Sequence, residues 1–154
     1  MRARTWILCM ALGAIPACAQ VEKVAMRTTG ISCGICAGLS ELYFHRVPGV
    51  DHVKISLSQE AILLTLKPGV AFDPKAIRDV LGPMKVGVVQ FQISVRGEVR
   101  KEGDKPFLLA GKDKFLVLDG SSAIPLDTPV HVEGVLYDRA SPMELRILTI
   151  KTLP

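Results

Sequence analysis

The sequence predicts an α+β fold in two parts, a β-α-β-β-α-β unit followed by a small all-β domain. Two segments carry apolar residues at helical spacing, and glycine and proline stand at their ends. The segments around them alternate apolar and polar residues or are rich in β-branched residues, which is typical of strands. After about residue 95 no helical period recurs, and strand patterns alternate with turns of Gly, Asp and Pro.

The first unit opens with a predicted strand over residues 21–29, which ends at Gly30. A helix is predicted over residues 36–47, because Pro48-Gly49 ends the helical spacing. Its inward-facing residues are expected to be Cys36, Tyr43, Phe44 and Val47, with Ser40 interrupting this stripe and Leu39 and Leu42 widening it on one side.

The rest of the unit consists of a hairpin, a second helix and a last strand. Asp73-Pro74 is an N-cap followed by a first-turn proline, and the helix that it opens ends at Gly82-Pro83. Three further strands are predicted, the first two joined by a turn at Ser58-Gln59, over residues 50–57, 61–67 and 86–95. This order of elements is the ferredoxin-like split arrangement.

The second part reads as strands alone. They are predicted over residues 95–100, 106–110, 114–118, 130–137 and 144–151. Five short strands in this span favour a small barrel, of which an OB-like one fits best, and Gly134 inside a strand pattern suits the bend such a barrel needs. No flexible linker separates the two parts, so we expect the last strand of the first to continue into the second.

The N-terminal segment has the features of an export signal. Arg2 and Arg4 precede an apolar run over residues 6–15, and Pro16-Ala17-Cys18-Ala19 resembles a small-residue cleavage site. The chain therefore divides into a signal peptide (1–19), a ferredoxin-like domain (20–95) and an all-β domain (96–154), with a periplasmic or other extracytoplasmic location. The alternative is lipid modification of Cys18, and only this would attach the protein to a membrane. Ile15 and Pro16 match a lipobox poorly, so cleavage of a signal peptide is favoured.

Charge excludes one class of partner. The whole chain carries a net charge of +4, and without residues 1–19 it keeps 17 basic and 15 acidic residues, a net charge of +2. That net charge is too small for a nucleic-acid or anionic-membrane surface, and the all-β part has few aromatic residues on which bases could stack.

Loss of residues 1–19 also removes Cys9 and Cys18, which leaves Cys33 and Cys36 as the only thiols.

These two thiols stand three residues apart at the start of the first predicted helix. A helix N-terminus carries partial positive charge, which favours thiolate over thiol. Thiolates select soft or borderline ions such as Cu(I) and Zn(II) over Mg(II) or Ca(II). A C-x-x-C pair also closes too small a loop to stabilise a fold much as a disulfide, so its role is expected to be chemical.

The two thiols belong to the motif Gly30-Ile31-Ser32-Cys33-Gly34-Ile35-Cys36, and Pro48-Gly49-Val50 ends the first helix at a fixed distance from it. In this motif and spacing, residues 21–93 resemble the heavy-metal-associated domain family, which includes copper chaperones and periplasmic mercury-binding carriers. The resemblance implies that Cys33 and Cys36 bind one soft metal ion and pass it on by ligand exchange. Cu(I) is the expected ion, with Hg(II), Ag(I) or Zn(II) as alternatives. Ser32, where zinc-preferring relatives often have Asp, favours a monovalent ion.

The resemblance also implies a class of partner, and the chain departs from the family pattern at several positions. The expected partner is a metal-transporting membrane protein or another metal carrier, and the chain is expected to be a monomer. Ile31 replaces a Met that packs beneath the motif loop, and Ser40 occupies a position that is normally apolar. Where relatives place Lys or Tyr near the metal, this chain has Met84 and Lys85. Met84 is a candidate for a further soft ligand, although Met is more often a loop or core residue, and Lys85 is a candidate for a balancing charge.

Two other classes of function remain open. Cys-x-x-Cys at a helix N-terminus is also the active site of thiol-disulfide oxidoreductases, although the Trp and the longer sheet of that class are missing. The other class is a non-catalytic interaction module whose thiols form a disulfide. We expect no enzyme, because no Ser-His-Asp, paired-carboxylate or phosphate-loop pattern stands out. His45, His52 and His131 are isolated and are expected to be surface or packed residues.

Overall fold

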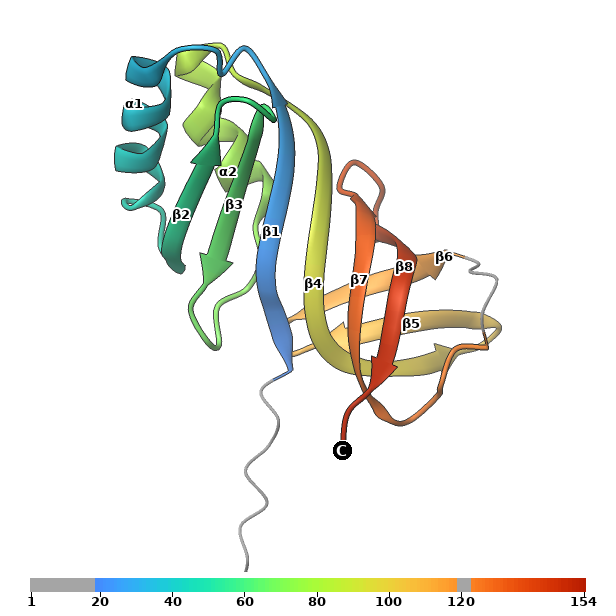
Figure 1. Ribbon diagram of the computed structural model, residues 1–154. Helices are drawn as coiled ribbons and strands as arrows, with labels where there is room; N and C mark the ends of the chain where they lie inside the picture. The colour runs from blue at the N-terminus through green and yellow to red at the C-terminus, as the bar shows by residue number, and fades with distance from the viewer. Residues whose placement is uncertain (1–18, 119–122) are drawn as a thin grey trace, which may run out of the picture.

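The computed structural model describes residues 19–118 and 123–154, and Figure 1 shows how their helices and strands are arranged. Residues 1–18 lie outside the described part, so the export signal and the alternative anchor at Cys18 stay predictions. In the part that is described, no helix is long and apolar enough to cross a membrane.

The first unit has the predicted order of elements. These are β1 (Gln20–Thr29), α1 (Gly34–Phe44), β2 (Val50–Ser56), β3 (Ala61–Leu66), α2 (Pro74–Leu81), the 3-10 helix η1 (Gly82–Met84) and β4 (Gly87–Glu102). The strands form an antiparallel sheet in the order β2-β3-β1-β4. Helices α1 and α2 contact each other, and they contact β2 and β4 respectively, so both cover the same face of this sheet (Figure 1).

Helix α1 differs from its prediction in its ends and in its buried face. It begins at Gly34, where Cys33 caps it, and it ends at Phe44 rather than at residue 47. Its buried residues are Ser40 and Phe44, whereas Tyr43 is 42% exposed, so the expectation that Tyr43 faces inward is wrong. Burial is centred on Ser40 because its hydroxyl finds partners inside the fold, which apolar spacing does not reveal. Leu39 and Leu42 lie on the exposed side.

Strand β4 joins the two parts of the molecule. Its 16 residues replace two predicted strands, over 86–95 and 95–100, and the predicted domain boundary at residues 95 and 96 lies within it. One edge pairs with β1 and then with β5, while the opposite edge pairs with β7 from Phe91 to Glu98. The last strand of the first part therefore runs on into the second, as expected.

The second part is a small closed barrel. Its further strands are β5 (Lys105–Ala110), β6 (Asp113–Leu118), β7 (Pro129–Tyr137) and β8 (Glu144–Thr152). The pairing closes in the order β4-β5-β6-β8-β7-β4, with β6 and β8 parallel and the other pairs antiparallel. At Gly134 the register of β7 with β8 shifts, and a Cβ there would meet the Arg146 carbonyl oxygen at 2.6 Å. The predicted irregularity at this glycine is present.

One hydrophobic core extends through both parts. Phe91, Ile93, Val95 and Val99, all on one face of β4, are at most 1% exposed and belong to the same cluster as residues of the sheet and of the barrel. The Phe72 ring meets Phe91 edge to face, with 6.1 Å between centroids. Because this face of β4 is buried from Phe91 to Val99, the strand keeps one apolar register across the junction.

Asp113 links the barrel to the loop before α2. Its carboxylate is 7% exposed and accepts the Phe72 backbone N–H, with N···O distances of 3.1 and 3.0 Å. Burial raises the pKa of the Asp113 carboxyl, and the hydrogen bond from Phe72 opposes that rise in part. A buried N–H outside regular structure is thus satisfied from the other part of the molecule.

A second link joins α2 to the barrel loop that follows β7. Arg78 donates two hydrogen bonds to Asp138, of 2.8 and 2.9 Å, and a third to the Val88 carbonyl oxygen at 3.1 Å. Its guanidinium also lies 4.9 Å from the centroid of the Phe91 ring. Burial raises the pKa of the Asp138 carboxyl, but the hydrogen bonds and charge of Arg78 outweigh it, so that the net pKa is below the ordinary value.

Replacing Asp113 with Ala is expected to lower the free energy of unfolding by about 1–3 kcal/mol, because the buried Phe72 N–H loses its acceptor. Asp113→Asn keeps an acceptor oxygen for that N–H and should destabilise less. Urea denaturation of both variants at pH 7 measures the difference. Equal losses in the two variants would contradict the role assigned to this hydrogen bond.

The Arg78–Asp138 pair should stabilise the protein in a pH-dependent way. A carboxyl whose pKa is lowered by folding contributes stability above its unfolded value of 3.8, and this contribution disappears as the pH falls through the folded value. Asp138→Asn should therefore cost about 1.5–3 kcal/mol at pH 7, and the gap to the wild type should narrow below about pH 4. Urea denaturation at several pH values tests this. Asp79→Asn, in the exposed pair with Lys75, is the control and should change stability little.

Candidate metal centre

The motif loop connects β1 to α1 and is fixed to the core by a buried hydrophobic residue. Ile31, which stands where the resemblance expects Met, is fully buried, so the hydrophobic residue at this position does pack beneath the loop. Ser32 is exposed, and Cys33 and Cys36 are each partly exposed. The loop therefore presents its two sulfur atoms near the surface.

Gly30 allows this loop to pass close to the segment before β4. Its φ angle is +86°, and a Cβ on it would meet the Lys85 carbonyl oxygen at 3.0 Å. Any other residue at this position would have a strained backbone conformation, and its Cβ would press against the Lys85 carbonyl group. The glycine of the motif is thus a requirement of the close approach between residues 30 and 85.

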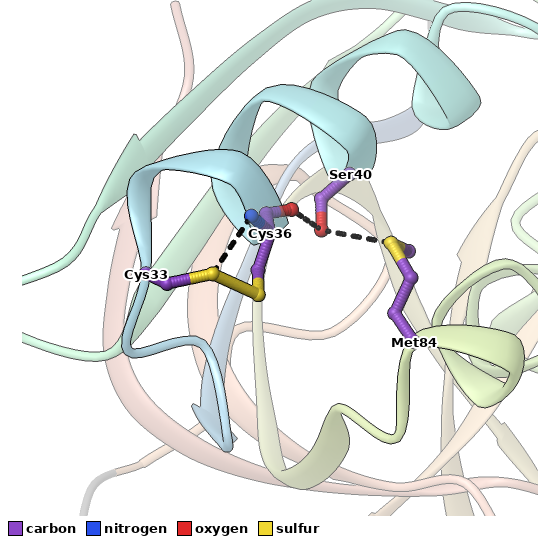
Figure 2. The surroundings of a disulfide bond; sticks show 4 residues. All are labelled: Cys33, Cys36, Ser40 and Met84. Atoms are coloured by element: carbon purple, nitrogen blue, oxygen red, sulfur yellow. Dashed lines mark hydrogen bonds between the residues drawn. A yellow bond between two sulfur atoms is a disulfide. The ribbon is translucent and has the colours of Figure 1, made fainter.

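Cys33 and Cys36 meet at the N-terminus of α1 (Figure 2). Cys33 is the N-cap residue, with extended backbone, and its Sγ accepts the Cys36 N–H at 3.1 Å. The Cα atoms lie 5.3 Å apart, and the two sulfur atoms are joined in a disulfide. The geometry brings both predicted ligands together, and their role as ligands stays a prediction.

Ser40 connects Cys36 to Met84, as the dashed lines in Figure 2 show. The Ser40 side chain is fully buried, and its hydroxyl donates to the Cys36 carbonyl oxygen at 2.8 Å. The same Oγ lies 3.5 Å from the Sδ of Met84, the last residue of η1, in the segment between α2 and β4. A hydroxyl bonded to the carbonyl one turn earlier is satisfied inside a helix, so a polar residue is accommodated in this core position.

The residues around Met84 were only partly foreseen. The sequence suggested Met84 and Lys85 near the metal; the structure places Met84 beside α1 and Lys85 on the exposed loop, in αL conformation. In the sequence, Ser40 is marked only as a departure from an apolar pattern. Its position four residues after Cys36 is the signal that would have predicted its bond to the Cys36 carbonyl.

The histidines lie elsewhere, as expected. His45 Nε2 lies 3.9 Å from Glu41 Oε1, and His52 Nδ1 lies 2.7 Å from Asp51 Oδ2. His131 Nε2 lies 2.8 Å from the Ser94 hydroxyl oxygen. Within residues 19–118 and 123–154, no three His, Cys, Asp or Glu side chains form a group that would hold a metal ion. In the described part, the candidate centre therefore consists of the two cysteine sulfurs and what borders them.

No protein-family model matches the chain, and no curated protein matches it. Among solved structures, one described as "CopZ metallochaperone" is similar over 44% of this chain and 98% of its own, at 18% identity and a TM-score of 0.40. Another, titled "Crosstalk between Cu(I) and Zn(II) homeostasis", is similar over 46% of this chain and 96% of its own, at 20% identity and a TM-score of 0.36. Likenesses this distant do not assign a family.

The arrangement supports two chemistries that exclude each other. In the reduced state, two thiolates at a helix N-terminus are a soft pair that leaves room for an incoming ligand. In the disulfide state each sulfur is bonded to the other, and neither is a thiolate ligand. Reduction of the disulfide takes up two electrons and two protons, and metal binding then releases the thiol protons.

Gly30→Ala is expected to destabilise the protein by about 1–3 kcal/mol, because it combines left-handed backbone with a close contact to the Lys85 carbonyl. Gly38→Ala is the matched control: Gly38 lies within α1 with open space around its Cα, so the same change should stabilise by about 0.5–1 kcal/mol. Thermal unfolding of both variants measures the two effects. A neutral Gly30→Ala would refute the close approach of the two loops.

Proposed function

We propose that this protein binds one soft metal ion through Cys33 and Cys36 and carries or sequesters it outside the cytoplasm. Cu(I) is the proposed ion, ahead of Ag(I), Hg(II) and Zn(II). The observation that carries the proposal is the pair of partly exposed cysteines at the N-terminus of α1. In the described part, no three His, Cys, Asp or Glu side chains form a metal-binding group there. A site of few ligands suits Cu(I), whereas structural zinc sites are closed by four.

The same geometry supports the proposal that the ion is passed on by ligand exchange. Because the two sulfurs lie near the surface, a thiolate of a partner has access to the bound ion. It would form a bond to the ion while one cysteine leaves, so that the ion is never free in solution. The proposed partner is therefore a metal-transporting membrane protein or another metal carrier with soft ligands of its own. We expect no catalytic reaction of the protein.

Export rests on the N-terminal segment, and it creates a redox requirement. Outside the cytoplasm, thiols tend to be oxidised, and the pair is close enough to form the disulfide seen in the structure. The metal-binding form would therefore need a reductant or would have to be loaded before oxidation. The charge near neutrality argues for a protein or metal partner and against nucleic acid.

A Cu(I) titration of the reduced protein against a chromophoric chelator tests the proposal. The chain from Gln20 onward keeps every described strand and helix, and Cys33 and Cys36 are its only cysteines. It is expected to bind one equivalent tightly, and Cys33→Ser or Cys36→Ser should each abolish this, because a single thiolate cannot replace the pair. Zn(II) run in parallel should bind more weakly. Wild type and variants that compete equally poorly would refute the proposal.

A thiol-disulfide oxidoreductase is the second candidate, and the disulfide at the helix N-terminus is the observation that favours it. It differs in its readout, because it would cycle with a dithiol reductant and would need no metal. The reduction potential of the Cys33–Cys36 pair, measured against glutathione, separates the two. A non-catalytic interaction module would show neither tight metal binding nor redox cycling.

A further inference from the structure

We propose that the thioether of Met84 is a third, reversible ligand of the soft ion held by Cys33 and Cys36. The inference rests on the proposed function and goes beyond it, because it adds a ligand from a different part of the chain and predicts which ions the site prefers. It follows from the position of the Met84 sulfur, from the ease with which that sulfur is released, and from its chemistry.

The position of Met84 is defined by two close approaches, one to α1 and one to the motif loop. Its Sδ lies 3.5 Å from the Ser40 hydroxyl oxygen, which is 2.8 Å from the carbonyl oxygen of Cys36 itself. A Cβ on Gly30 would meet the carbonyl oxygen of the neighbouring Lys85 at 3.0 Å. The segment that carries Met84 therefore lies beside both α1 and the loop before Cys33, with the Met84 sulfur directed at Ser40 (Figure 2).

Release of the Met84 sulfur leaves no buried polar group unpaired. The Ser40 hydroxyl has one proton, and its shorter bond is to the Cys36 carbonyl, so this bond remains when the sulfur leaves. The bond that is lost is a weak contact to a thioether. Met84 is only partly buried at the margin of the core, and a methionine side chain has three rotatable bonds with which to reach toward the thiolates.

The chemistry of a thioether suits a third ligand of Cu(I). Two thiolates and Cu(I) together carry one negative charge, and a neutral thioether adds none, whereas a third thiolate would add another. Thioether sulfur is a soft ligand that selects Cu(I), while Zn(II) sites are built from thiolate, imidazole and carboxylate. Met84 should therefore strengthen binding of Cu(I) and Ag(I) and leave binding of Zn(II) unchanged. As a neutral ligand it would leave readily when a partner's thiolate arrives.

The first test is the number of sulfur atoms around the metal in the wild-type protein. X-ray absorption at the copper edge is measured on the reduced chain from Gln20 onward, loaded with one equivalent of Cu(I), with reductant removed and no added thiol. Three sulfur neighbours are expected. A two-sulfur shell in the wild type overturns the inference, and this readout does not depend on the folding of any variant.

The second test is Met84→Leu, which conserves volume and removes the sulfur. Cu(I) affinity is expected to fall at least about tenfold, the lower end of the loss caused by removing outer-shell partners of metal sites. The sulfur count should fall from three to two, and Zn(II) affinity should stay the same. The matched control is Met143→Leu, a partly buried methionine of the barrel, which should change neither quantity.

The outcomes separate the inference from the proposed function. If Met84→Leu keeps wild-type Cu(I) affinity and a three-sulfur shell, Met84 is not a ligand, while the function at Cys33 and Cys36 stands. If Cys33→Ser and Cys36→Ser keep wild-type affinity, the proposed function fails and the inference fails with it. If Met84→Leu weakens Cu(I) and Zn(II) equally, the methionine only supports the loop, and the inference is refuted.

Discussion

Pairing of β4 on both of its edges is the constraint on which the rest of the structure depends. From Phe91 to Arg96 this strand is bonded to β1 on one side and to β7 on the other, so every residue there belongs to the sheet and to the barrel at once. Its buried face supplies core residues to both parts, and the links from Asp113 to Phe72 and from Arg78 to Asp138 close over the junction. A strand shared in this way leaves no room for a linker.

The same strand positions the candidate metal centre. The segment between α2 and β4 carries Met84 and Lys85, and its route is set by where β4 begins beside the end of β1. Thr29 at the end of β1 pairs with Gly87 at the start of β4. The motif loop that follows β1 and the segment that precedes β4 therefore begin next to each other. The contact of Gly30 with Lys85 and the contact of Ser40 with Met84 are consequences of this pairing.

Few ligands and partial exposure give the site its chemical character. Two sulfurs at a helix N-terminus form either a disulfide or a pair of thiolates, and only the second state offers thiolate ligands for the proposed soft ion. A neutral third sulfur would raise selectivity without closing the site.

Local sequence patterns determined much of this protein. The β-α-β-β-α-β order, the small all-strand second part, and the place of Cys33 and Cys36 at the start of α1 follow from periodicity, from glycine and proline, and from the motif. These features depend on neighbours in the sequence, so a single chain suffices to predict them. A small barrel was likewise expected from the five short strands, and their pairing closes it.

Only the tertiary structure decided the contacts between distant segments. Ser40 and Met84 are 44 residues apart, Phe72 and Asp113 are 41 apart, and Arg78 and Asp138 are 60 apart. Apolar spacing predicted an inward Tyr43, whereas the fold buries Ser40, whose hydroxyl is hydrogen-bonded to the Cys36 carbonyl and so is not left unsatisfied. Which polar atoms find partners depends on how the sheet pairs, and local patterns carry no information about that.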